Sequence, residues 1–196
     1  MNYDTNNGKP LDKRYMQPVF FAYLKATEGA TIKDETYSVR CVEAERHEIM
    51  KGAYHFMHLG SPVEEQIRNF VETVNWTKGD LPPALDIEVD AEIKEYGKGR
   101  LVEMALEWLE KIETTMNVRP IIYTRENIRN MYLSDERFRK YDFWIARYSD
   151  KGPNNFDWHF WQKTENGVLE GYDKQIDINL FKGDFASFSK YIKNVK

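Results

Sequence analysis

Two acidic residues in the segment from Leu81 to Asp90 give the strongest chemical signal in this sequence. Pro82 and Pro83 start a strand where their missing N–H groups do little harm, and the side chains that follow alternate between two faces. Asp86 and Glu88 therefore share a face and lie roughly 6 to 7 Å apart along the strand. One negative charge at that distance disfavours the other, so one carboxyl can keep its proton near neutral pH. The pair suits acid-catalysed glycosidic cleavage, in which Glu88 delivers the proton and Asp86 supplies negative charge.

The surroundings of this strand decide between a catalytic and an ordinary role for the pair. In a solvated antiparallel sheet, the acidic face would simply contact water. In a parallel barrel, one face packs against helices and the other faces the interior, where carboxylates are costly unless they lie at the open mouth. Barrel enzymes carry out their chemistry at that mouth, formed by the carboxyl ends of the strands.

Short apolar runs alternate with helix-period segments along the chain, which is typical of βα units around a largely parallel sheet. The predicted helices cover 63–74 and 101–112, with weaker ones over 36–49 and 185–192. The predicted strands are Phe20 to Lys25, Lys51 to Phe56, Ala84 to Val89, Arg119 to Tyr123, Phe143 to Arg147, Trp158 to Gln162 and Ile176 to Asn179, with a possible first strand near Tyr3. After Tyr148 the helical signal fades. We therefore predict an α/β fold, an irregular TIM-like (β/α) barrel with about five βα units and later strands that lack full helices.

The composition limits the class of protein. With 196 residues and 41% hydrophobic residues, the chain suits one sizeable core, and we predict a single domain over 1–196. The net charge of −4 and the mixed signs leave no basic stripe, so nucleic acid is not an expected partner. No apolar run reaches the roughly 18 residues of a membrane span, and the start of the given sequence lacks a signal-peptide core. The lone Cys41 cannot form an intrachain disulfide, and the histidines share no metal-ligand spacing, so we expect neither a disulfide nor a metal. We expect no organic cofactor either.

Four short segments occur in a characteristic order and spacing over nearly the whole chain. They are FAYLKATEG at 21–29, GAYHF at 52–56, LPPALDIE at 81–88 and IDINLFKG at 176–183. As an ordered set they resemble glycoside hydrolase family 25, the Chalaropsis-type lysozymes. The resemblance implies an irregular barrel that hydrolyses the β-1,4 bond between N-acetylmuramic acid and N-acetylglucosamine in bacterial peptidoglycan. It also implies a protein that is secreted or acts at the cell wall, and we expect a monomer.

The resemblance also assigns roles at the site. It implies that Glu88 is the proton donor, that Asp86 is its acidic neighbour, and that Asp177 is a further active-site carboxylate. By itself, an aspartate in the position of Asp177 would more often cap a turn.

The start of the chain departs from the family pattern. Family members usually open with Asp-Val-Ser, followed by Gln-Gly or Asn-Gly, and that aspartate belongs to the catalytic group. Asn7 and Gly8 fit the second part, but the usual spacing places the acid near Met1 or Asn2. Asp4 is its counterpart only if a short deletion is allowed. The alternative is that this carboxylate is missing, which would leave a peptidoglycan-binding barrel with impaired catalysis.

Further positions at the strand ends are candidates for substrate binding. Tyr54 and Tyr123 suit ring and hydroxyl contacts to sugars, although either could be a half-buried packing tyrosine. Lys25 and Glu28 could pair to organise the site or merely close a loop. Trp144 and Trp161 resemble the aromatic wall of the family, where a sugar ring can stack. Another barrel glycosidase, such as a chitinase, is a further alternative, because paired acids on one strand occur there too.

Overall fold

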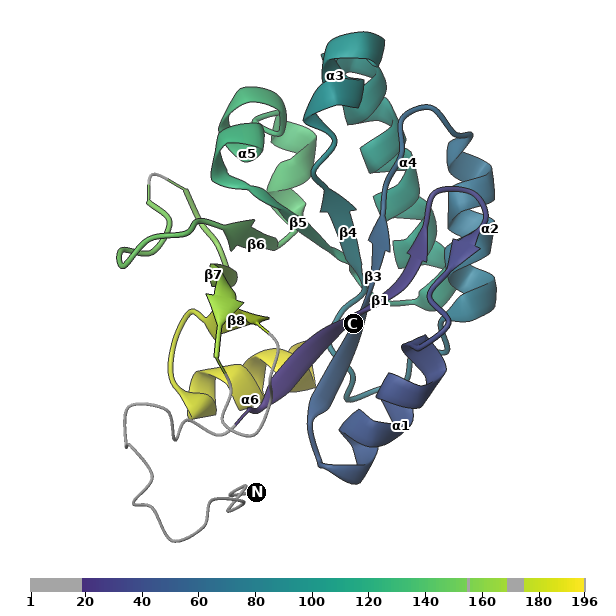
Figure 1. Cartoon of the computed structure of the whole chain (residues 1–196). Helices are drawn as coiled ribbons and strands as arrows, with labels where there is room; N and C mark the ends of the chain where they lie inside the picture. The colour runs from purple at the N-terminus through teal and green to yellow at the C-terminus, as the bar shows by residue number, and fades with distance from the viewer. Residues whose placement is uncertain (1–18, 155, 169–174, 196) are drawn as a thin grey trace, which may run out of the picture.

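The computed structural model describes residues 19–154, 156–168 and 175–195. In this part of the chain, eight strands form one curled sheet in the order β2-β1-β3-β4-β5-β6-β7-β8 (Figure 1). The strands are β1 Phe21–Glu28, β2 Ile32–Lys33, β3 Met50–Phe56, β4 Ala84–Ile87, β5 Ile121–Arg125, β6 Phe143–Ala146, β7 Phe160–Gly167 and β8 Ile176–Phe181. Every pair of neighbouring strands from β1 to β7 in this order is parallel. At the two edges, β2 pairs antiparallel with β1, and β8 pairs antiparallel with β7.

Helices connect the early strands and are missing from the later connections. The helices are α1 Tyr37–Arg46, α2 Val63–Thr73, α3 Asp90–Tyr96, α4 Lys98–Met116, α5 Glu126–Tyr132, the 3-10 helix η2 Glu136–Lys140, and α6 Phe185–Asn194 after the last strand. The described residues between β6 and β7 form no helix, and β8 folds back beside β7. The predicted irregular TIM-like fold with reduced late connections is therefore confirmed. The possible strand near Tyr3 lies outside the described residues.

Several element boundaries differ from the prediction. Strand β4 ends at Ile87 instead of Val89, and β7 runs from Phe160 to Gly167 instead of from Trp158 to Gln162. The short helices α3 and α5 and the two-residue strand β2 were not predicted. Each has seven residues or fewer, too short for a periodic pattern to identify it reliably.

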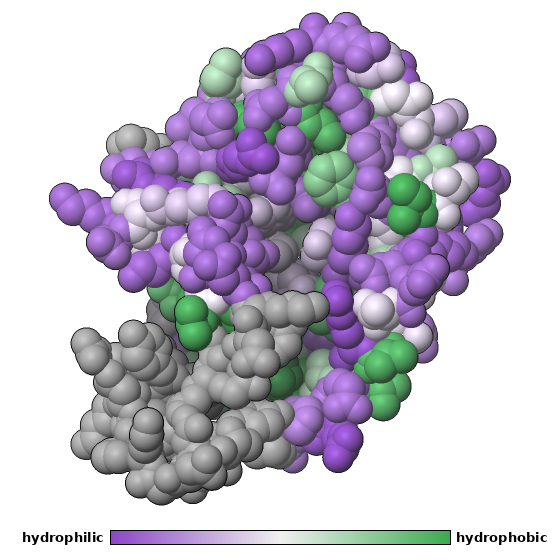
Figure 2. All heavy atoms as spheres, viewed as in Figure 1, coloured by the Kyte–Doolittle hydropathy of each residue, from purple (hydrophilic) through white to green (hydrophobic). Residues whose placement is uncertain are grey.

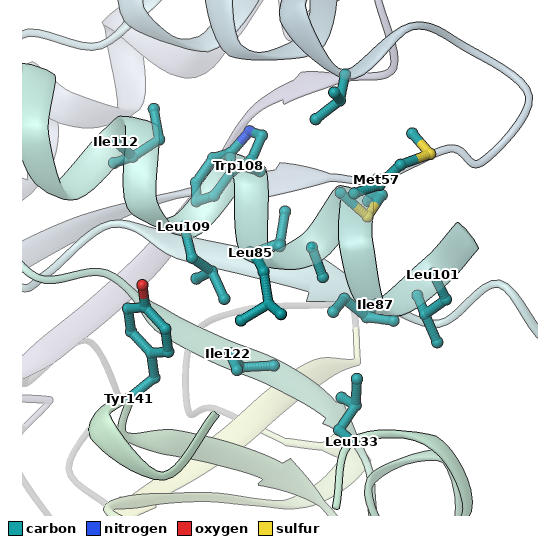
Figure 3. Packing of buried hydrophobic residues seen from close by; sticks show 14 of the residues in the cluster. Met57, Leu85, Ile87, Leu101, Trp108, Leu109, Ile112, Ile122, Leu133 and Tyr141 are labelled. Atoms are coloured by element: carbon teal, nitrogen blue, oxygen red, sulfur yellow. The ribbon is translucent and has the colours of Figure 1, made fainter. Parts of the chain in front are cut away.

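The main core lies between the outer face of the sheet and helices α2 and α4 (Figures 1 and 3). Leu85 and Ile87 of β4 and Ile122 of β5 pack there against α4, whose Trp108 and Leu109 are fully buried. Burying each such side chain contributes about 1.5–3 kcal/mol. Because side chains alternate along a strand, this packing directs the other residues of β4 toward the inside of the curled sheet.

A second, largely aromatic cluster fills the inside of the curled sheet. It contains Ala84, Tyr123, Trp144 and Phe160, and Tyr23 of β1 stacks on Trp144 with ring centroids 4.5 Å apart. The aromatic contacts bring the first and late strands together across the interior. The polar residues near the carboxyl ends of the strands lie above this packed layer.

Hydrophilic residues dominate the face in Figure 2, where hydrophobic side chains form separate patches. Among the described residues, no helix has the length and apolar character needed to cross a bilayer.

Candidate active site

Asp86 is the innermost acid of the site. It follows Ala84 on the inner face of β4, and its side chain is 5% exposed. Its Oδ1 atom has no hydrogen-bond partner among the described residues. Burial and then the charge of Glu88 raise the pKa of Asp86 well above its usual value, whereas Lys25 and Arg125 act in the opposite direction. Asp86 therefore holds a proton more readily than an ordinary aspartate, which the spacing of the two acids predicted for one member of the pair.

Glu88 lies just beyond the end of β4, and its side chain is 20% exposed. Arg125, the last residue of β5, donates from Nε to Glu88 Oε1 at 2.8 Å and from Nη1 to Asp90 Oδ2 at 3.2 Å. The register of the two strands explains the contact, because Thr124 is level with Ile87 and the next residues are neighbours. Neither Arg125 nor Asp90 was predicted as part of the site.

Asp177 belongs to the same group of acids. It lies on β8, and burial raises the pKa of its carboxyl, while hydrogen bonding to Gln162 opposes that rise. The pKa of Tyr54 indicates that these acids lie near one another. Burial raises its pKa, and the negative charges of Asp86, Asp177, Asp34 and Glu88 raise it further, in that order of size. The three predicted carboxylates thus act electrostatically on a single tyrosine at the end of β3.

Gln162 connects two tyrosine hydroxyls beside these acids. Tyr123 donates to Gln162 Oε1 at 2.7 Å, and Tyr148 donates to the same atom at 3.1 Å. Tyr123 is nearly buried, whereas Tyr148 is half exposed at 52%. Tyr148 was not predicted, because it follows β6 in a segment without periodic pattern. Its exposed ring is available to a ligand, while the ring of Tyr123 is mainly packed.

The two tryptophans predicted as an aromatic wall are separated by the structure. Trp144 lies in the inner cluster and donates from Nε1 to Asn179 Oδ1 at 2.8 Å. Trp161 is level with Ile145 of β6, which belongs to the outer core, so it lies on the other face of the sheet. Its Nε1 donates to the carbonyl oxygen of Arg147. Both rings are at least 93% buried, and Trp161 is not brought to the acids.

A chain of charged residues extends from the end of β1 to α3. Lys25 Nζ pairs with Glu28 Oε2 at 2.5 Å, and Glu28 Oε1 accepts from His58 Nε2 at 2.9 Å. The other ring nitrogen of His58 contacts Glu92 Oε1 at 2.6 Å, and Glu92 also accepts from the backbone N–H of Leu59. The predicted pairing of Lys25 and Glu28 is thus present, but it is one part of a longer network that joins three elements.

The histidine in the GAYHF segment has a structural role. His55 is fully buried, its Nδ1 accepts from the Thr27 hydroxyl at 2.7 Å, and its Nε2 donates to Gln66 Oε1 at 3.1 Å. Burial lowers the pKa of His55 to about 4, so the ring is neutral. Within the described residues, no group of three or more His, Cys, Asp or Glu side chains could hold a metal ion. Asp4 lies outside the described residues.

Comparison with known proteins identifies the family. The model of glycosyl hydrolases family 25 matches residues 4–172. Similar proteins include "Uncharacterized protein YegX" of Escherichia coli strain K12, 29% identical over 90% of this chain and 64% of its own length, and "Lysozyme M1" of Streptomyces globisporus, 30% identical over 85% of this chain and 61% of its own. The chain thus spans less than two thirds of these relatives.

A solved structure supports the same assignment. A family 25 glycosyl hydrolase from Bacillus anthracis aligns with a TM-score of 0.80 and 30% identity, covering 87% of this chain and 82% of its own. The matched segment contains the strand that carries Asp86 and Glu88. The chain therefore belongs to glycosyl hydrolase family 25.

Proposed function

We propose that this protein is a muramidase that cleaves the β-1,4 bond between N-acetylmuramic acid and N-acetylglucosamine in bacterial peptidoglycan. Its place of action is then the cell wall, and the site needs no metal or organic cofactor. The observation that carries the proposal is the position of Asp86 and Glu88 at the carboxyl end of β4, where their charges and that of Asp177 act on both Tyr54 and Tyr123. Membership of family 25 supports the choice of substrate.

In this mechanism, Glu88 delivers a proton to the glycosidic oxygen. Its side chain is 20% exposed, whereas the neighbouring Asp86 is buried, and its longer arm reaches beyond the end of β4. Breaking the bond from C1 to oxygen leaves positive charge at C1, which the neighbouring aspartates stabilise, Asp177 by its charge and the buried Asp86 to the extent that it ionises. We favour attack on C1 by the acetamido oxygen of the substrate, with an aspartate orienting that group, followed by hydrolysis. This route retains the anomeric configuration, so NMR that finds the α-anomer released first would exclude it.

The decisive experiment compares the wild-type protein with Glu88→Gln in clearing turbid suspensions of purified cell walls. Glu107→Gln is a matched control, because Glu107 is an exposed residue of α4 with no ion pair in the described structure. We expect Glu88→Gln to lose at least about 100-fold in rate, the usual contribution of general acid catalysis, and Glu107→Gln to keep wild-type activity. Equal clearing by wild type and Glu88→Gln would exclude Glu88 as the acid.

The alternatives give different outcomes in the same experiment. A binding barrel without turnover would sediment with cell walls but release no fragments, for the wild type as well as for Glu88→Gln. A chitinase would cleave chitin oligomers in preference to peptidoglycan. Mass spectrometry of the products from both substrates separates these possibilities.

A further inference from the structure

The contact between Arg125 and Glu88 has consequences for the proposed reaction. A guanidinium group only donates hydrogen bonds and stays charged at any pH in which proteins fold. The ion pair with Glu88 at 2.8 Å therefore matches the ionised carboxylate. A general acid must instead present a proton to the glycosidic oxygen. The contact involves Oε1 of Glu88 only, yet a positive charge beside the carboxyl opposes its protonation, so loss of this contact favours the protonated acid.

The surroundings of Arg125 make such an exchange feasible. Its side chain is 49% exposed, and its second partner, Asp90, is 39% exposed. Exposed ion pairs contribute little net stability, because both charges are also well solvated when apart. The neighbouring cation at the end of β6 differs in this respect. Arg147 is 26% exposed and contacts both oxygens of Glu126 at 2.8 Å, so it is held more firmly.

The group that best replaces Glu88 as a partner is another carboxylate. The planar guanidinium binds carboxylates through two parallel hydrogen bonds. Muramic acid differs from glucosamine by a lactyl group that ends in a carboxyl, and this carboxyl is either free or linked to a stem peptide that itself carries carboxylates. Both sources of a carboxylate lie on the sugar that is bound beside the cleaved bond. A ligand of this kind would reach Arg125 only together with the substrate.

We propose that Arg125 is a specificity-determining residue that exchanges its contact with Glu88 for a contact with a carboxylate of the bound glycan. This inference rests on the proposed function. Substrate binding then frees Glu88, which takes up a proton from water and delivers it to the glycosidic oxygen. Glycans that lack this carboxylate leave the ion pair in place and are cleaved slowly.

The test uses three forms of one glycan. The first carries stem peptides, the second has been stripped by an amidase so that the lactyl carboxylate is free, and the third is the stripped glycan with that carboxylate capped as a methylamide. We expect the wild type to cleave the capped form about tenfold more slowly than the better carboxylate form, as one charge-assisted contact is lost. The difference should fall mainly on kcat. If the stripped form is cleaved faster, the lactyl carboxylate is the partner of Arg125. If the peptide form is cleaved faster, the partner is a carboxylate of the stem peptide.

Arg125→Gln should cleave all three forms at similar rates. The matched control is Arg137→Gln, because Arg137 is 48% exposed and also bridges two carboxylates, Glu103 and Asp135, away from the strand ends. The control should keep the wild-type preference. The exchange is wrong if the wild type cleaves the capped glycan as fast as the others, or if Arg125→Gln keeps the preference. Absence of cleavage of every form by the wild type would instead overturn the proposed function, and the exchange with it.

Discussion

Replacing His58 by glutamine should destabilise the protein in a pH-dependent way. His58 lies between Glu28 and Glu92, at 2.9 and 2.6 Å, and the three side chains are 24% to 33% exposed. Burial opposes the charge on the ring, but the hydrogen bonds and charges of the two carboxylates outweigh it and raise the pKa of His58. The hydrogen bond from His58, followed by that from Lys25, lowers the pKa of Glu28. Glutamine keeps one hydrogen bond but removes the positive charge between the two acids.

The expected magnitude follows from the exposure of these groups. A hydrogen bond to a charged group contributes about 1.5–3 kcal/mol when it is shielded, and an exposed ion pair about 0–1 kcal/mol. Because the network is partly exposed, we expect a loss of about 1–2 kcal/mol in the free energy of unfolding. In a protein of this size that lowers Tm by about 2–8 °C.

The sign of the pH dependence follows from the two shifts. The raised pKa of His58 gives stabilisation that is complete below its ordinary value of 6.5 and is lost as the pH rises through the folded-state pKa. The lowered pKa of Glu28 gives stabilisation that is present above its ordinary value of 4.5 and is lost on acidification. The difference between wild type and His58→Gln should therefore be largest between about pH 5 and 6.5.

Urea denaturation at pH 5.5 and pH 9 measures this difference. Lys33→Gln is the control, because it also removes a positive charge, but from an exposed ion pair with Glu72 at 3.8 Å. A loss of stability that is equal at both pH values would show that His58 acts by packing alone. No loss at pH 5.5 would show that the network contributes nothing to stability.

Three further substitutions test the packing of the site and its backbone. Gly52→Ala would place a Cβ 2.5 Å from the ring of Tyr23 and 2.9 Å from Leu81 Cβ, so thermal melting should show a loss of about 1–3 kcal/mol. Asp86→Asn should abolish wall clearing yet raise the free energy of unfolding at pH 7 by about 1–2 kcal/mol. The reason is that its raised pKa makes ionisation unfavourable in the folded state; the gain should shrink at pH 4. Asn117→Gly, at φ 52° after α4, should raise stability by about 0.5 kcal/mol in the same melting assay.

Much of the fold could be predicted because hydrophobic periodicity is a local property. Every described strand of four or more residues overlaps a predicted strand. The alternation in β4 also predicted correctly that Leu85 and Ile87 face the helices while Asp86 faces inward. The ends of the strands were harder to predict than their existence. Strand β1 continues to Glu28 because Thr27 and Glu28 pair with His55 and Phe56 after a register shift, and such pairing depends on a distant segment.

Some features of the candidate site could be predicted from one segment of the sequence, whereas others depend on contacts between distant segments. The closeness of Asp86 and Glu88 follows from one short segment, and the effect of Glu88 on the pKa of Asp86 could be predicted from their spacing alone. The separation of Trp144 from Trp161 depends on which face of β7 packs outward, which the sequence of that strand does not indicate. The network through His58 joins β1, the end of β3 and α3, and nothing in the three segments indicates that they meet.

Arg125 shows most clearly how a site can differ from what its catalytic motif indicates. Read along β4, Asp86 and Glu88 are two carboxylates with the same face and similar neighbours. In the folded chain, burial acts on Asp86, while a cation from the next strand reaches Glu88 at 2.8 Å. The two acids therefore differ because Asp86 is buried, while the register of β4 and β5 places Arg125 in hydrogen-bond contact with Glu88. A site motif thus specifies which groups can carry out the chemistry, whereas packing and the neighbouring strand determine the surroundings in which each of them meets the substrate.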